Sequence, residues 1–386
     1  MPSTGDASAI DAALIFDGES YLENYSVVIR GERIEQILPT AQRDASLPAT
    51  SLQQGALAPG FIDLQVNGGG GLMLNNAPSS ETVAKIAQAH RGCGTTALLP
   101  TVMSDSQEVV QSAAEAVREA QRRGHPGVLG LHIEGPFFEP RRRGAHRAEH
   151  IRELTTQDLD WLCSIGDLQI MLTLAPEHCR PADLSRLRDS GLLLCAGHTE
   201  ASYAQINTAA DNGLVGITHL YNAMSQVTPR EPGTVGAALE NDKLWVGIIA
   251  DGHHVHAANI RSAFRAKPRG GMVLVSDAMA TVGAAQDDFE LYGETVTAQA
   301  GRLVNADGVL AGSAIGLMDA VKFAVECVGI DPAECLRMAS HYPARILGVD
   351  DTRGRIAPGY RADMVHFDPD YQVQHTWCAG AHLVHG

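Results

Sequence analysis

Short apolar runs alternate with amphipathic helical patterns along the middle of the chain. The helical patterns include "SSETVAKIAQAHRG" and "RPADLSRLRDSG", in which apolar residues recur every three or four positions. Eight apolar runs have the length of buried strands: 61–66, 96–101, 128–133, 169–174, 192–196, 213–218, 245–250 and 272–276. Strands that alternate with helices in this number predict a TIM-type (β/α)8 barrel. A doubly wound open sheet is the alternative, but "NGGGG" lacks the glycine spacing of a nucleotide-binding turn.

The two ends of the chain have a different pattern. Short β-like runs such as "AALIFDG" and "YSVVIRGERIEQIL" are separated by the turn signals Asp17-Gly18 and Gly31-Glu32. The C-terminal stretches "GRIAPGYRADMVHFD" and "YQVQHTWCAGAHLVHG" have the same character. We therefore predict a small β-sandwich domain built from residues 1–56 and 357–386, and a barrel domain of residues 57–356.

The composition limits the classes of partner. Among 386 residues, 29 Lys and Arg face 45 Asp and Glu, which gives a formal net charge of -16. This charge argues against a nucleic-acid or anionic-membrane binder, although a local pocket can still hold an anionic small molecule. The seven cysteines form no CxxC pair, and "MPSTGDASAID" lacks the features of a signal peptide. We expect a cytoplasmic protein with no membrane-spanning segment.

Ionisable residues follow several of the predicted strands. Glu134 ends "VLGLHIE", and His198 and His219 follow the runs in "LCAGHTEA" and "GITHLYNA". The carboxyl ends of barrel strands meet at one mouth, so these three side chains should lie together. A buried ionised carboxylate also needs a partner. We predict that Glu134, His198 and His219 bind one divalent metal ion, with zinc favoured over iron, cobalt or manganese.

Two further strand ends supply candidates for catalysis. Asp277 in "VLVSDAMA" can act as the general base for an attacking water, although an Asp that caps the next segment is the structural alternative. In "GIIADGHHV", His254 or His253 can polarise a substrate carbonyl, and spacing alone does not separate them. His132 and Cys195 are expected to serve only in packing and internal hydrogen bonding.

A set of ordered motifs resembles one known family. The motifs are "LAPGFIDLQVNGGGG", "LHIEGPFF", "AGHTEA", "THLYNAM", "REPG", "IADGHHV", "VSDAMA" and "LAGSAIGLMDA", and they extend over nearly the whole chain. Together they resemble the N-acetylglucosamine-6-phosphate deacetylases of the amidohydrolase superfamily. The resemblance implies a (β/α)8 barrel with a small β-sandwich. It also implies hydrolysis of N-acetyl-D-glucosamine 6-phosphate to D-glucosamine 6-phosphate and acetate.

The resemblance also implies roles for individual residues. Asp277 would take a proton from water and return it to the leaving amine, and His254 rather than His253 would contact the substrate. Gln65-Val66-Asn67 stands where many amidohydrolases carry an HxH pair, so one metal ion is expected rather than two. The implied substrate-binding residues are Ala145, His146, Asn222, Ala223, Arg230, Asp251, His254, Leu310, Ala311, Gly312 and Ser313.

Some interpretations stay open at the level of the sequence. The resemblance implies a homodimer in which Arg230 reaches the neighbouring active site, whereas a surface ion pair with Glu231 is the alternative. Arg141–Arg143 predict a solvated loop or a mobile flap. Competing functions are deacetylation of N-acetylgalactosamine 6-phosphate, hydrolysis of cyclic amides or deamination on the same barrel, and a metal-free scaffold. Arg230 and the "LYNAM" segment argue against the cyclic-amide and deaminase alternatives.

Overall fold

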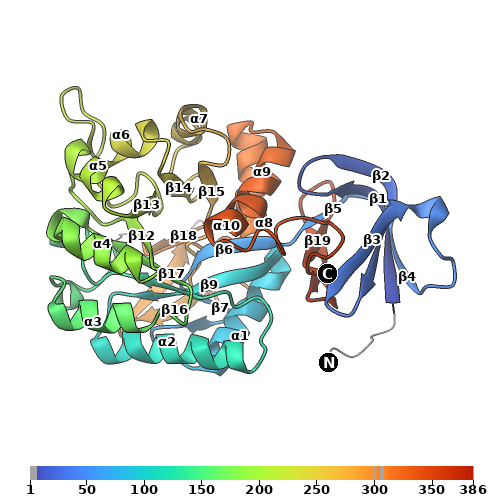
Figure 1. The fold of residues 1–386 in the computed structure, drawn as a ribbon, viewed down its shortest axis with the longest axis horizontal. Helices are drawn as coiled ribbons and strands as arrows, with labels where there is room; N and C mark the ends of the chain where they lie inside the picture. The colour runs from blue at the N-terminus through green and yellow to red at the C-terminus, as the bar shows by residue number, and fades with distance from the viewer. Residues whose placement is uncertain (1–6, 300, 305–307, 309, 386) are drawn as a thin grey trace.

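A computed structural model describes residues 7–299, 301–304, 308 and 310–385, in which a barrel stands beside a smaller β domain (Figure 1). Parallel strands pair in the order β15-β14-β13-β12-β11-β10-β9-β6. Their bounds are β6 Phe61–Val66, β9 Thr95–Met103, β10 Leu131–Glu134, β11 Ile170–Leu174, β12 Leu193–Ala196, β13 Leu214–Ile217, β14 Trp245–Ile248 and β15 Met272–Leu274.

The ring closes between its first and last strands. The Asp277 amide donates to the Gln65 carbonyl at 3.0 Å, and the Asn67 amide donates to the Ala278 carbonyl at 2.9 Å. The eight predicted runs thus form one parallel barrel, and the prediction of a (β/α)8 fold is confirmed. The open-sheet alternative is wrong.

Amphipathic helices surround the barrel. In α2, the Ser106 hydroxyl accepts a hydrogen bond from the Val109 amide at the N-terminus, and the buried face includes Val110, Ala113 and Val117. The helices are α1 Ser80–Ala89, α2 Gln107–Arg122, α3 Thr156–Ser164, α4 Pro181–Asp189, α5 Tyr203–Asp211, α6 Gly233–Glu240, α7 Ala257–Ala266, α8 Leu317–Phe323, α9 Pro332–Ala339 and α10 His341–Ile346. Within the residues described, no helix has both the length and the apolar composition needed to cross a bilayer.

Both ends of the chain build the small β domain. Its strands are β1 Ala7–Phe16, β2 Tyr21–Arg30, β3 Arg33–Pro39, β4 Ala49–Leu52, β5 Ala56–Pro59, β19 Met364–Phe367, β20 Val373–Cys378 and β21 Ala381–Val384. This mostly antiparallel sheet has an apolar core of its own, which includes Ile15, Leu57 and Trp377. The domain boundaries after residues 56 and 356 stay a prediction.

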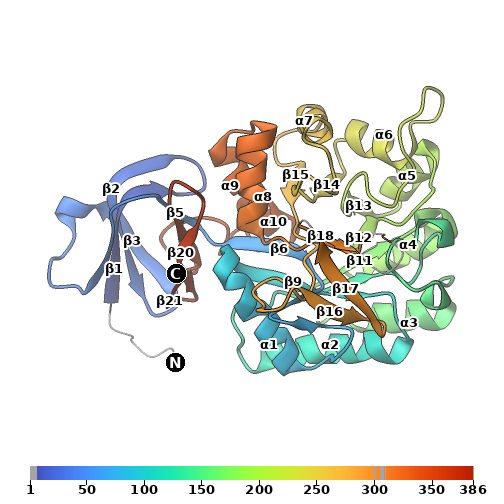
Figure 2. The same cartoon turned by 180° about the vertical axis from the view of Figure 1, so that it is seen from behind.

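Two small sheets lie outside these layers and were not predicted. Strands β7 Gly68–Gly69 and β8 Leu72–Met73 form a short hairpin. Strands β16 Asp288–Leu291, β17 Glu294–Gln299 and β18 Arg302–Val304 form an antiparallel sheet, which Figure 2 shows in front of the barrel strands. Its apolar side packs against Met103, Met279 and Ala311, so this sheet covers part of the barrel mouth.

Candidate active site

Four buried ionisable side chains stand at the carboxyl ends of the barrel strands. Glu134 is the last residue of β10, His198 follows β12, His219 follows β13 and Asp277 follows β15. His198, His219 and Asp277 have φ angles of 51°, 33° and 52°, in the left-handed region that side chains with a Cβ rarely adopt. Such a conformation costs about 1–3 kcal/mol per residue and is found mainly at functional sites. The surrounding structure therefore holds these three residues in place.

The three predicted metal ligands converge on one point. His219 Nε2 lies 3.1 Å from both Glu134 Oε1 and His198 Nε2, and His198 Nε2 lies 3.4 Å from Glu134 Oε1. These atoms lie close enough to one another to hold one metal ion. Three side chains that are far apart in the sequence are thus brought together as predicted.

The chemistry of this donor set fits a cation. The Arg142 carbonyl accepts a hydrogen bond from His198 Nδ1 at 2.8 Å, which leaves the lone pair of His198 on Nε2. That lone pair faces the ring nitrogen of His219 and the carboxylate of Glu134, so a cation between the three atoms would find three electron-pair donors. Burial raises the pKa of Glu134, but the contacts with His198 and His219 outweigh this effect and hold the pKa well below its usual range. The ionised carboxylate suits a divalent metal ion.

Two amides fix Asp277 beside the ligands. Gln65 Nε2 donates to Asp277 Oδ1 and to Glu134 Oε1, both at 3.0 Å, and Asn67 Nδ2 donates to Asp277 Oδ1 at 2.7 Å. Burial, and then the nearby charge of Glu134, raise the pKa of Asp277 to about 6. A cation at the three ligands opposes this rise, because it favours the ionised carboxylate. Asp277 is therefore placed and poised to accept a proton.

A cavity of about 170 Å³ opens above these residues. It is lined by Glu134, His198, His219 and Asp277, and by Met103, Gly144, Met279 and the predicted residues Ala145, His146, Asn222, Ala223, His254, Leu310 and Gly312. Asp251, Ala311, Ser313 and Arg230 do not line it. The structure therefore brings most, but not all, of the predicted substrate-binding residues to one cavity.

The structure shows which of the two adjacent histidines, His253 and His254, faces the cavity, a choice that the sequence leaves open. His254 Nδ1 donates to Asp251 Oδ2 at 2.6 Å, and Asp251 Oδ1 accepts hydrogen bonds from the His253 and His254 amides. This arrangement turns the His254 ring into the cavity, whereas His253 is exposed. Asp251 acts on the cavity through His254.

Three other predicted residues also lie behind or outside the cavity. The Ser313 hydroxyl donates to the Ser276 carbonyl at 2.6 Å, so it supports the segment before Asp277. Ala311 packs in the apolar cluster beneath β16–β18. Arg230 is exposed, and the carboxylate of Glu231 accepts hydrogen bonds from the Tyr203 and Gly233 amides. The alternative interpretation of Arg230, an ion pair with Glu231, is not found among the described residues.

Each of the three consecutive arginines forms a defined contact within the protein. Arg141 is exposed and pairs with Glu139, whereas Arg142 pairs with Glu200 at 2.5 Å. The Arg143 guanidinium donates to the His146 carbonyl at 2.9 Å. Arg142 and Arg143 thus fasten the segment that carries Ala145 and His146.

Several residues that hydrogen-bond to the site are not evident from the sequence. The sequence marks Gln65 and Asn67 only as poor metal ligands, yet their amides donate to the carboxylates of Glu134 and Asp277. Ser104 was not singled out, although its amide and hydroxyl contact His146 Nδ1 at 3.2 and 2.9 Å. Amide donors opposite carboxylates are a recognisable pattern, but only the closed ring shows which carboxylates they meet. His132 is an interior residue bonded to Thr101 and Thr173, as expected.

Comparison with known proteins agrees with this site. Residues 56–383 match the model of the amidohydrolase family, and residues 9–57 match the NagA composite domain. The chain belongs to the amidohydrolase family.

Named relatives of this amidohydrolase act on two epimeric sugars. The chain is 41% identical over 343 residues to the N-acetylgalactosamine-6-phosphate deacetylase of Shewanella sp. (strain ANA-3), and the match covers 88% of this chain and 86% of the relative. It is 36% identical over 368 residues to the N-acetylglucosamine-6-phosphate deacetylase of Haemophilus influenzae, covering 95% and 96%. The crystal structure of N-acetylglucosamine-6-phosphate deacetylase from Pasteurella multocida has a TM-score of 0.95 and 35% identity, covering 98% and 100% of the two chains.

Proposed function

We propose that this amidohydrolase removes the acetyl group from N-acetyl-D-glucosamine 6-phosphate, with water as the second substrate and D-glucosamine 6-phosphate and acetate as products. One observation carries the proposal: the donor atoms of Glu134, His198 and His219 lie 3.1–3.4 Å apart, in the same cavity as Asp277. The named activities of relatives at 36% and 35% identity support the substrate.

Glu134, His198 and His219 would hold one divalent metal ion, which supplies positive charge for an attacking water and for the substrate carbonyl. We propose zinc, because imidazole and carboxylate ligands suit it. Iron, cobalt and manganese accept the same ligands. The side-chain amides of Gln65 and Asn67 donate hydrogen bonds to the carboxylates of Glu134 and Asp277, which is consistent with a single metal ion.

Asp277 would accept a proton from water as the oxygen of that water bonds to the carbonyl carbon. When the bond between carbon and nitrogen breaks, the same carboxyl returns the proton to the leaving nitrogen, which becomes the free amine. His254 would donate a hydrogen bond to the carbonyl oxygen as negative charge develops there. The Asp251 carboxylate at Nδ1 orients this ring and stabilises a positive charge on it.

Residues at the rim of the cavity would hold the sugar phosphate. We propose that Ala145, His146, Asn222 and Ala223 contact it, and that the guanidinium of Arg230 comes from the neighbouring subunit of a homodimer. The exposure of Arg230 and its position outside the cavity of its own chain support this arrangement. The phosphorylated substrate agrees with a cytoplasmic location.

Acetate release tests the proposed function directly. The protein should hydrolyse N-acetyl-D-glucosamine 6-phosphate, and it should lose most of its kcat/KM on the unphosphorylated sugar because the phosphate contacts are missing. Release of acetate from neither sugar, in protein that contains one equivalent of metal, would contradict the proposal.

Deacetylation of N-acetylgalactosamine 6-phosphate is a second candidate, because the relative with 41% identity carries that name. The two sugars are epimers that differ in one hydroxyl. We expect kcat/KM to be higher for the gluco substrate, and measurement of both epimers under the same conditions decides the question. A higher kcat/KM for the galacto substrate would reverse our assignment.

Mixed dimers test the contribution of Arg230. Arg230→Ala and Asp277→Asn should each be nearly inactive alone. When they are mixed and allowed to exchange subunits, half of the dimers pair one copy of each, and one site in such a dimer combines an intact Asp277 with an intact Arg230. Activity should return to about a quarter of the wild-type level. No recovery, in a sample shown to contain mixed dimers, would place Arg230 outside the neighbouring site.

A further inference from the structure

A second cleft lies at the end of the barrel opposite the active site. Its volume is about 410 Å³, and it is lined by Gly18, Glu19, Arg269, Arg337, His341, Tyr342, Arg345 and Arg355, which we call the arginine cleft. Arg269 precedes strand β15, whereas Asp277 follows it, so the two sites stand at opposite ends of one strand. Gly18 and Glu19 come from the small β domain, so the cleft lies where this domain meets α9 and α10.

Positive charge gathers in this cleft although the chain as a whole is acidic. Arg337 pairs with Glu334 at 2.8 Å, Arg269 lies 3.5 Å from the same carboxylate, and Arg355 pairs with Glu19. The side chain of Arg345 forms no ion pair or hydrogen bond among the residues described by the structure. Burial, followed by the charges of Arg355 and Arg345, lowers the pKa of His341 below its usual value.

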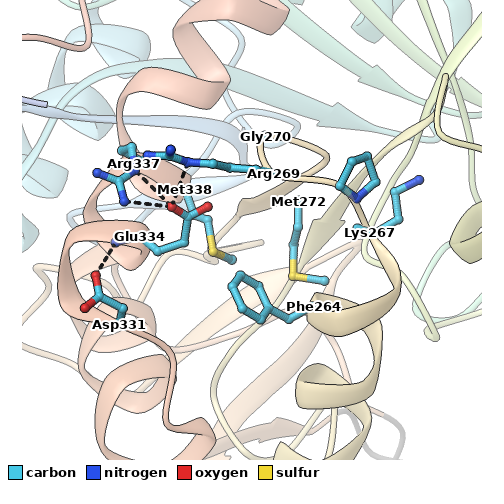
Figure 3. Close-up of a pocket in the computed structure, with 10 residues that line it drawn as sticks. Phe264, Lys267, Arg269, Gly270, Met272, Asp331, Glu334, Arg337 and Met338 are labelled. Carbon is cyan, nitrogen blue, oxygen red and sulfur yellow. Dashed lines mark hydrogen bonds and ion pairs between the residues drawn. The ribbon is translucent and has the colours of Figure 1, made fainter. Parts of the chain in front are cut away.

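An adjoining cavity of about 400 Å³ shares Arg269 and Arg337 with the cleft. Figure 3 shows both guanidinium groups beside the carboxylate of Glu334. The side chains of Phe264, Met272 and Met338 also line this cavity. The two cavities therefore join a cationic surface to an apolar one.

The charges of the two cavities do not balance. The cavities are lined by the cations Arg269, Arg337, Arg345 and Arg355 and by the carboxylates Glu19, Asp331 and Glu334, so four cations face three anions. The ammonium of Lys267 instead donates to the Ala238 and Asn241 carbonyls. The excess of one positive charge stands in a chain with a formal net charge of -16. The charge distribution therefore favours an anionic ligand at this place.

Donor groups remain free to meet such a ligand. A guanidinium has five N–H donors, and Arg345 uses none of them within the described structure. The side chain of Arg269 is 69% exposed despite its long contact with Glu334. Planar guanidinium groups bind phosphate oxygens in pairs, which a single point charge cannot do.

We propose that the arginine cleft binds a phosphate-bearing small molecule. Its phosphate lies against Arg269, Arg345 and Arg355, and its uncharged portion lies against Phe264 and Met272 in the adjoining cavity. This site is separate from the metal ligands, so its occupancy does not depend on the proposed deacetylase activity.

Equilibrium dialysis with radiolabelled inorganic pyrophosphate tests the proposal on the full chain. The variant Arg269→Ala/Arg345→Ala removes two exposed cations of the cleft. The control Arg122→Ala/Arg186→Ala makes the same change of charge on α2 and α4, where both arginines are exposed. Any binding in the active site contributes equally to both proteins. The cleft variant should lose at least tenfold in affinity at one site relative to the control, and equal binding curves would overturn the proposal.

A crystal structure after soaking gives an independent result that needs no variant. Pyrophosphate density at Arg345 supports the proposal, and density confined to the active-site cavity overturns it. Adenosine 5′-diphosphate then tests the apolar part. It should bind the cleft more tightly than pyrophosphate, and equal affinity would overturn the placement of the uncharged portion at Phe264 and Met272.

Discussion

Asp277→Asn is expected to lower kcat by about 10³-fold or more, because an amide cannot take a proton from water and return it to nitrogen. The amide oxygen can still accept the hydrogen bonds from Gln65 and Asn67, so the local structure should persist. Metal content and the affinity for a non-hydrolysed substrate analogue should therefore stay near those of the wild type. Steady-state kinetics, metal analysis and calorimetry on the same sample measure the three quantities.

Asp189→Asn on α4 is a suitable control for this experiment. Asp189 pairs with Arg188 and its side chain is 66% exposed, so the same chemical change there should leave kcat unaltered. If Asp277→Asn keeps kcat within tenfold of the wild type, Asp277 does not transfer the proton. If the variant loses its metal instead, the role of Asp277 is to hold the site together.

Glu134→Gln is expected to abolish activity by removing the metal. Glu134 is 2% exposed and supplies the only negative charge among the three ligands. A neutral amide is a much poorer ligand, and the two histidines alone do not hold a divalent ion tightly. Purified Glu134→Gln should contain less than a tenth of the metal of the wild type, as measured by mass spectrometry of the element.

Two controls accompany Glu134→Gln: the same substitution at an exposed glutamate, and removal of the metal from the wild type. Glu149→Gln makes the same change at a side chain that is 65% exposed, and it should keep both metal and activity. Chelator treatment of the wild type should reproduce the inactive state, and added zinc should reverse it. One full equivalent of metal in Glu134→Gln would mean that the cation lies elsewhere.

The barrel could be predicted because its strands are continuous apolar runs between amphipathic helices. The sheet β16–β18 could not, and its turn shows why. β16 and β17 are joined by Tyr292 and Gly293, whose φ angles are 54° and 76°. Two-residue hairpin turns of this kind usually carry Asn or Asp at the first position. With Tyr292 at this position, the sequence carries no recognisable hairpin-turn signal. The Tyr292 hydroxyl donates a hydrogen bond to the Ser104 carbonyl.

The convergence of Glu134, His198 and His219 could be predicted because each one stands at the end of an apolar strand. The partners that orient them depend on the register between strands. Gln65 meets Glu134 and Asp277 only because β6 closes the ring against β15, and no pattern within one segment contains that information. Adjacent residues such as His253 and His254 differ only in the direction of their side chains, which the Asp251 carboxylate decides.

The left-handed backbone at His198, His219 and Asp277 has a consequence for how this protein can evolve. Glycine or asparagine would adopt those φ angles at lower energy, so the residues that give the chain its chemistry are not those that its backbone prefers. Selection for heat resistance alone would drift toward such substitutions and erase the activity. A laboratory screen for more durable variants should therefore keep turnover under selection at every round.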